Sequence, residues 1–191
     1  MNTLLLALVL AASPICDVND PVLPDNDYPM VVLETSLGSF EVELDRRKAP
    51  ITVNNFLRYV VDGSYDGTIF HRVVPGFVAQ TGGYDPDFEE RPEHAPIFNE
   101  SGNGLANRKY SIAMARHSDP HSAQAQFYIN LADNDGLNPN SRSWGYTVFG
   151  QVINGYDVVD QFNDVQTGYH ADLDSEEVPV TPITLLSVKV K

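Results

Sequence analysis

The sequence predicts a mainly β protein in which an antiparallel sheet closes on itself and two helices lie against it. Many short apolar runs are separated by Gly, Pro, Asn and Asp, as expected for strands joined by turns. Phe40, Val42 and Leu44 alternate with glutamates, which is the period of a strand with one exposed face. Two segments show the three- and four-residue spacing of an amphipathic helix. A closed sheet is favoured because it leaves few exposed edges.

Length and composition indicate one globular domain. A chain of 191 residues can bury a sizeable core, and its apolar share of 42% and charged share of 20% are ordinary. The formal net charge is −14, and the longest basic run is Arg46-Arg47-Lys48. This charge argues against nucleic-acid and anionic-membrane partners, because both are polyanions. We expect a monomer.

The N-terminus resembles a targeting segment. The apolar residues 4–12 are too few to span a bilayer as a helix and suit the hydrophobic part of a secretory signal. We therefore assign residues 1–16 to a signal segment and expect export, to a bacterial periplasm or beyond, in preference to the cytoplasm. Cys16, the single cysteine, excludes an intrachain disulfide and a cysteine-based zinc site. It also permits a lipoprotein in which a lipid on Cys16 anchors the chain, although Ile15 is not the small residue usual before such a cysteine.

The first structured elements are predicted after an acidic linker. Residues 17–29 contain three prolines and little periodicity, so they are interpreted as a linker or extended tether. Residues 30–34 and 40–44 then flank a turn and predict a β-hairpin. After Pro50 the period changes to that of a helix, which Gly63 is placed to end. Its apolar stripe consists of Val53, Phe56, Leu57, Val60 and Val61.

The rest of the chain alternates predicted strands with polar loops. Within residues 69–81, Pro75-Gly76 separates two strands. A second, short helix is predicted from the spacing of Tyr156, Val158, Val159 and Phe162. Residues 84–109, 133–142 and 167–182 are predicted to be irregular. The remaining predicted strands are residues 110–114, 126–130, 146–152 and 183–190.

Arg72 is the residue in the stretch 70–83 that most needs an explanation. Its guanidinium lies among many apolar neighbours and therefore needs a partner, for which Gln80 is the nearest uncharged candidate. The alternative is that Arg72 is a surface residue whose stem covers apolar neighbours while its charge stays in water.

Four segments together resemble the signature of the cyclophilin family of peptidyl-prolyl isomerases: residues 70–83, 113–116, 125–130 and 144–150. The similarity runs over residues 30–191 and is greatest to small single-domain bacterial cyclophilins. The resemblance implies an eight-stranded antiparallel barrel with a helix at each end, a packed interior and a binding site on the outer wall. It implies isomerisation of X-Pro bonds in proline-containing segments of folding or exported proteins, without a cofactor.

The resemblance also assigns roles to individual residues. Arg72 would donate a hydrogen bond to the prolyl nitrogen of the twisted amide, with Gln80 holding its guanidinium. Phe77 completes this catalytic set and also belongs to the proline pocket. Val78, Tyr128 and Leu137 would line that pocket, with Met114 beside it. Gln126 and the backbone of Arg116 would hold the peptide, and Ala115 would leave room for it. Tyr146 would complete the set of substrate-binding residues.

Three positions depart from the family pattern. Tyr128 stands where phenylalanine is usual, so its hydroxyl needs a partner. Tyr146 stands where many eukaryotic members have histidine, as in the bacterial branch. Gly136 stands where relatives have tryptophan or phenylalanine, and we therefore expect weak cyclosporin binding; Trp144 is nearby but is interpreted as a packing residue.

Other residues and other functions need separate interpretations. His117 and His121 could begin a metal site, but a third ligand is not apparent and we predict no metal. His71 is interpreted as a packed core histidine. The main alternative function is a cyclophilin-like chaperone or scaffold that binds proline-containing segments with little turnover. The set Arg72, Phe77 and Gln80 favours the enzyme, and a surface-anchored assembly factor would rest on Cys16 alone.

Overall fold

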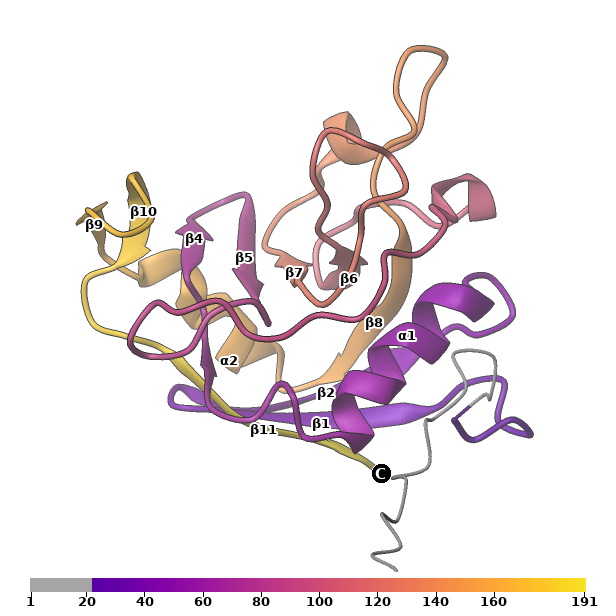
Figure 1. The fold of residues 1–191 in the computed structure, drawn as a ribbon, viewed down its shortest axis with the longest axis horizontal. Coiled ribbons are helices and arrows are strands. Elements are labelled where there is room, and N and C mark those ends of the chain that lie inside the picture. Colours follow the sequence, from indigo (N-terminus) through magenta and orange to yellow (C-terminus); the bar gives the residue numbers. More distant parts are fainter. Residues whose placement is uncertain (1–21) are drawn as a thin grey trace, which may run out of the picture.

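The computed structural model describes residues 22–191, which form a curled antiparallel sheet with helices packed against it (Figure 1). The order of the nine strands is β3-β11-β1-β2-β8-β6-β7-β5-β4. Their bounds are β1 (Met30–Thr35), β2 (Gly38–Leu44), β3 (Thr68–Ile69), β4 (Arg72–Val74), β5 (Val78–Thr81), β6 (Ser111–Met114), β7 (Phe127–Asn130), β8 (Val148–Asn154) and β11 (Thr184–Val190).

The sheet comes back on itself through its two edge strands. β3 pairs with β11 and β4 pairs with β5, yet only Phe70 and His71 separate β3 from β4 in the chain. The two edges are therefore consecutive pieces of one interrupted strand, and counting them as one gives eight strands. The predicted mainly β fold is confirmed. The two edges of the sheet are joined through the covalent chain and not by a continuous ladder of hydrogen bonds between strands.

The opening hairpin forms as its alternation predicts. Phe40, Val42 and Leu44 are buried, whereas Glu43 between them is exposed. β1 and β2 pair in register, with Val31 opposite Val42. This hairpin supplies the apolar surface that the first helix needs.

Helix α1 (Pro50–Val61) starts with Pro50, where a missing backbone N–H costs no hydrogen bond. Of its predicted stripe, the residues up to Val60 are buried, but Val61 is 58% exposed. Residues 55–60 are all buried, so the buried part of the helix ends at Val60, one residue before its C-terminus. Gly63 follows with φ +67° and donates its N–H to the carbonyl of Val60 at 3.1 Å, which ends the helix as predicted.

The remaining helices are short. Helix α2 (Tyr156–Asp160) runs directly into the 3-10 turn η3 (Gln161–Asp164), so the predicted second helix is present with a tightened end. Two further 3-10 turns, η1 (Ser101–Asn103) and η2 (Asp135–Leu137), interrupt the predicted loops.

Residues 167–182 were predicted to be irregular, and this prediction is wrong. They contain a separate hairpin of β9 (Thr167–His170) and β10 (Ser175–Pro179), which lies beside β4 (Figure 1). Val178 is buried while Glu176 is exposed, and Asp174 takes a left-handed turn conformation with φ +45°. Both strands are too short to show an alternation in the sequence, and β10 also contains two consecutive glutamates.

The N-terminal segments can be placed only in part. The predicted signal segment and Cys16 lie outside the described residues. Of the predicted linker, residues 22–29 are described and are bonded to the domain: the N–H of Val22 donates to Asn54 Oδ1 at 2.8 Å, and the N–H of Arg46 donates to the carbonyl of Asp27 at 3.0 Å.

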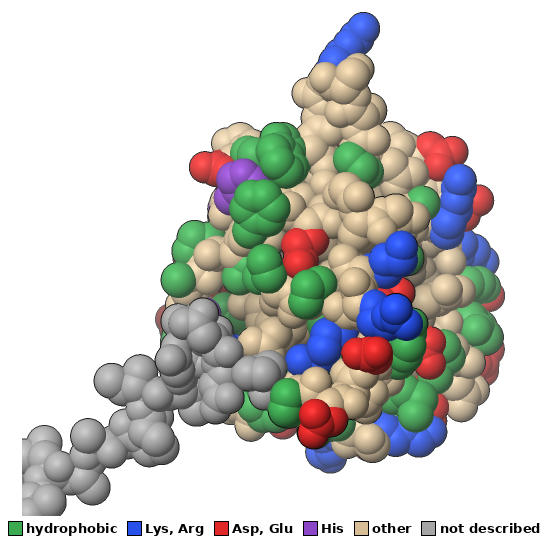
Figure 2. Space-filling view, turned by 90° about the vertical axis from the view of Figure 1, so that its right-hand side faces the viewer, with side chains coloured by type: hydrophobic (Ala, Val, Ile, Leu, Met, Phe, Trp, Pro, Cys, Tyr) green, Lys and Arg blue, Asp and Glu red, His purple; other side chains and the backbone are tan. Residues whose placement is uncertain are grey.

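Among residues 22–191, helices of the length and apolarity required to cross a bilayer are absent. On the face drawn in Figure 2, Lys and Arg side chains lie among Asp and Glu side chains.

Candidate functional site

Two apolar clusters share the wall of the sheet. The larger fills the interior and includes the ring of Phe56, which packs against Tyr65, Phe127 and Phe149 at centroid distances of 5.2–5.3 Å. The smaller lies on the outer side and is made by Val78, Ala113, Tyr128 and Val148, with Phe77, Leu137 and Tyr146 packed on it.

A pocket of about 360 Å³ opens on the smaller cluster. It brings together most of the residues predicted for the site, from strands far apart in the chain. Its lining is Arg72, Phe77, Val78, Gln80, Ala115, Arg116, Tyr128, Leu137 and Tyr146.

Met114 is not among these lining residues. It is 1% exposed and belongs to the interior cluster, whereas its neighbour Ala113 belongs to the outer one. Successive strand residues point to opposite faces, so only one of the two can face the pocket.

Arg72 and Gln80 lie directly opposite each other in the β4–β5 register, but they have different partners. Arg72 Nε donates to Glu177 Oε2 at 2.5 Å, and Gln80 Nε2 donates to Gln126 Oε1 at 2.8 Å. The partner of the guanidinium is thus a carboxylate on β10, which was not among the residues predicted from the sequence. The rule that a cation among apolar residues seeks a carboxylate could have directed attention to the acidic residues 167–182.

Arg72 lies at the rim of the pocket. Its side chain is 34% exposed, and its Cζ is 5.9 Å from the centre of the Phe77 ring. This distance is at the outer limit of a cation–π contact, so the ring adds a weak attraction and mainly excludes water from one side of the guanidinium.

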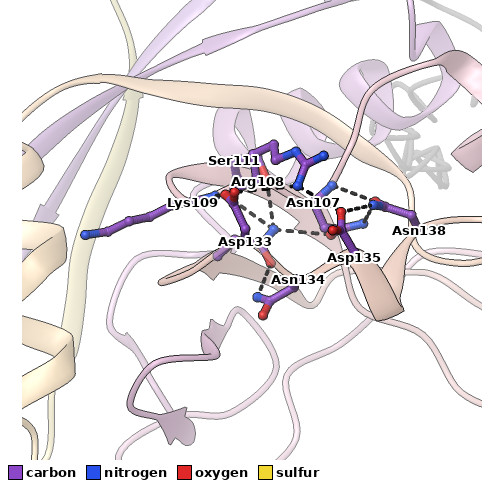
Figure 3. A network of polar contacts seen from close by, with 9 residues as sticks. Asn107, Arg108, Lys109, Ser111, Asp133, Asn134, Asp135 and Asn138 are labelled. Atoms are coloured by element: carbon purple, nitrogen blue, oxygen red, sulfur yellow. Dashed lines mark hydrogen bonds and ion pairs between the residues drawn. The ribbon is translucent and has the colours of Figure 1, made fainter.

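The floor of the pocket is set by a polar network behind Tyr128. The Tyr128 hydroxyl donates to Asn107 Oδ1 at 2.8 Å, which provides the partner that the added hydroxyl needs. Asn107 is held in turn by Asn138, whose Oδ1 accepts the Asn107 N–H at 2.7 Å (Figure 3). Burial raises the pKa of the Tyr128 phenol well above its ordinary value, so it stays neutral and its ring remains an apolar wall.

A second rim residue is fixed by the loop before β8. Arg116 Nε donates to the carbonyl of Gly145 at 3.0 Å, and its Cζ lies 4.5 Å from the centre of the Tyr146 ring. Tyr146 in turn meets Tyr128 edge to face at 5.9 Å. Arg116 therefore contributes to the rim through its side chain, and this contribution does not depend on the peptide-binding role predicted for its backbone.

Gln126 lines a smaller cavity of about 100 Å³ beside the pocket, which shares Gln80, Ala115 and Arg116 with it. Glu93 also lines this cavity, and burial raises the pKa of its carboxyl. The two cavities together form a depression that continues from an apolar into a polar part.

The two loop histidines do not share a site. His117 lines the smaller cavity, whereas His121 stacks on Phe98 with ring centres 4.5 Å apart and accepts the Asn99 N–H on Nδ1. Within residues 22–191, clusters of three or more His, Cys, Asp and Glu suited to a metal ion are absent.

Gly136 and Trp144 leave part of the rim open. A Cβ placed on Gly136 in η2 has no atom within 4 Å. Trp144 is 49% exposed and packs edge to face against His121 at 4.9 Å, outside the pocket lining.

His71 is a buried side chain between β3 and β4. Burial lowers the pKa of His71 to about 4, with the neighbouring Arg72 charge lowering it further against opposing hydrogen bonds. The side chain is therefore neutral near pH 7 and available for packing, which it does edge to face against Tyr84 at 4.7 Å.

This burial makes stability depend on pH. The unfolded pKa is about 6.5 and the folded pKa about 4, so the unfolded chain binds more protons between these values and stability falls as the solution is acidified. Between pH 7 and 4.5, His71 is expected to remove about 2 kcal/mol from the free energy of unfolding. Urea unfolding gives the free energy of unfolding of wild type and of His71→Gln at each pH in this range. The effect is the difference between the slopes of the two plots of this free energy against pH, and parallel plots would contradict it.

Comparisons with known proteins point to one family. The family described as cyclophilin type peptidyl-prolyl cis-trans isomerase/CLD matches residues 30–190. A peptidyl-prolyl cis-trans isomerase of Streptomyces antibioticus is 50% identical over 163 residues, covering 84% of this chain and 97% of the relative. Peptidyl-prolyl cis-trans isomerase B of Escherichia coli is 45% identical over 162 residues, covering 82% and 99%. A crystal structure of a Cryptosporidium parvum cyclophilin type isomerase superposes with a TM-score of 0.71 at 22% identity, covering 86% of this chain and 98% of that one, which shows the fold alone.

Proposed function

The chain belongs to the cyclophilin-type family of peptidyl-prolyl cis-trans isomerases, and on this premise we propose that Arg72 accelerates rotation of X-Pro bonds held in the 360 Å³ pocket. The observation that carries the proposal is a guanidinium at the rim of a pocket that opens on a cluster of apolar side chains. The substrates are proline-containing segments of other proteins.

The reaction asks for little beyond positioning and charge. Amide resonance sets a rotation barrier of about 18–20 kcal/mol, and uncatalysed X-Pro exchange takes about 10–100 s. In the twisted state the prolyl nitrogen regains a localised lone pair that accepts a hydrogen bond. A donor that meets this lone pair stabilises the twisted state more than the planar one, and so lowers the barrier.

The geometry of Arg72 suits this role. Within residues 22–191, Glu177 accepts the hydrogen bond from Arg72 Nε, and the two terminal amino groups of the guanidinium remain as donors. Phe77, Val78, Tyr128 and Leu137 would enclose the proline ring, since they form the apolar part of the lining. The chain on the other side of the bond would lie over Ala115 towards Gln126, where the depression becomes polar.

An exchange measurement distinguishes this enzyme from a binding module. A catalytic amount of the protein added to an Ala-Pro peptide is expected to produce cis–trans exchange cross peaks in NMR within a mixing time in which the free peptide shows none. The rate should vary little from pH 6 to 8, because His71 is neutral throughout and proton transfer is not required. Peptide binding without exchange would support the chaperone or scaffold alternative.

Three further expectations remain proposals. Weak cyclosporin binding follows from the open rim at Gly136, and a nanomolar dissociation constant in a titration would contradict it. We also propose a monomer, which sedimentation checks. Export through residues 1–16, with or without a lipid on Cys16, is testable by fractionating cells that express the full chain.

A further inference from the structure

We propose that Glu177 is a positioning residue for this isomerase, which holds the guanidinium of Arg72 in the orientation that serves the prolyl nitrogen. The inference rests on the proposed role of Arg72 and adds to it the residue that aims the catalytic side chain. It also gives the β9–β10 hairpin a function in the site.

The contact between the two side chains has the geometry of a directed ion pair. Arg72 Nε donates to Glu177 Oε2 at 2.5 Å, and the Arg72 side chain is 34% exposed against 43% for Glu177. Nε is the donor nearest the stem, so a bond there restricts rotation of the planar guanidinium while its terminal amino groups stay free to act. Charge-assisted hydrogen bonds of this kind are shorter and stronger than neutral ones.

The remainder of the Arg72 surroundings does not replace this bond. Phe77 approaches the guanidinium only to 5.9 Å, and Gln80, directly opposite Arg72, donates to Gln126 instead. In the described part of the chain, Glu177 is thus the residue that accepts a hydrogen bond from the Arg72 side chain.

The hairpin that carries Glu177 is anchored on both of its sides. Val178, the next residue on β10, is 4% exposed, and β10 contacts β4 directly. On β9, the His170 ring stacks on Phe88 with ring centres 3.8 Å apart. A carboxylate delivered from an anchored strand loses little further freedom when it pairs, which is what a positioning group needs.

The test uses three substitutions at this position and one beside it. Glu177→Ala is expected to lower the rate of isomerisation on the enzyme about tenfold, while the peptide dissociation constant changes less than twofold, because orientation and not binding is lost. Glu177→Gln keeps an acceptor oxygen and should stay within about threefold of wild type. Glu177→Lys places a like charge on Arg72 and should lose at least as much as Glu177→Ala. Glu176→Ala removes the exposed neighbouring carboxylate and should have no effect.

Exchange NMR of an Ala-Pro peptide separates the rate on the enzyme from the dissociation constant, and the Arg72 Nε–H resonance reports the bond itself. That resonance should be protected in wild type and Glu177→Gln and lost in Glu177→Ala, with melting temperatures within about 4 °C of one another. The positioning role is overturned if Arg72→Ala abolishes turnover while Glu177→Ala retains it. It is also overturned if the turnover of Glu177→Gln is as low as that of Glu177→Ala. If Arg72→Ala itself retains turnover, the role proposed for Arg72 fails first.

Discussion

Replacement of Arg72 by Ala is expected to lower kcat/KM for an Ala-Pro peptide by about 100- to 1000-fold, which is the usual cost of removing one preorganised donor to a developing charge. The loss should fall mainly on the rate of isomerisation on the enzyme, since the apolar residues proposed to hold the proline ring are unchanged. Arg72→Lys keeps the charge but loses the planar fork and the Nε bond to Glu177, so an intermediate activity is expected.

The fold should survive this substitution. The Arg72 side chain is 34% exposed on the outer wall, and its partner Glu177 is 43% exposed, so each can be hydrated when the other is removed. Arg142→Ala removes an exposed guanidinium from a loop outside the pocket lining and serves as the matched control. Activity of Arg72→Ala within a few fold of wild type, with Arg142→Ala unchanged, would show that the cation is not the catalyst.

Local patterns predicted the elements whose faces differ clearly in polarity. The alternation around Val42 and the helical stripe containing Phe56 each have one buried and one wet side, so the period is visible in the sequence. In β6 every residue is buried, and the sequence alone therefore could not decide whether Ala113 or Met114 faces the pocket.

The partner of Arg72 could not be predicted for a different reason. Gln80 is near in sequence and faces the same side, but the actual partner, Glu177, is 105 residues away on a hairpin too short to have a period. Resemblance to a family supplied the pocket residues, whereas contacts made by a segment without a recognised motif require coordinates.

The second large effect is expected in the interior. Phe56→Ala should lower the free energy of unfolding by about 3–5 kcal/mol, because it removes a fully buried ring and leaves a cavity that the sheet cannot fill by collapsing. The ring touches Tyr65 from the segment after α1, Phe127 of β7 and Phe149 of β8, so the substitution loosens the attachment of the helix to two strands together.

Ile51→Ala is the control on the same helix, since Ile51 is 45% exposed and its truncation should cost about 0.5 kcal/mol or less. Urea unfolding measures both variants, and equal losses would contradict the interior cluster described above. The link to function runs through β7, where Phe127 faces Phe56 and the next residue, Tyr128, faces the pocket. Well below its melting temperature, Phe56→Ala should therefore still bind an Ala-Pro peptide with little change, because the bond from Tyr128 to Asn107 holds the pocket floor independently of the interior ring.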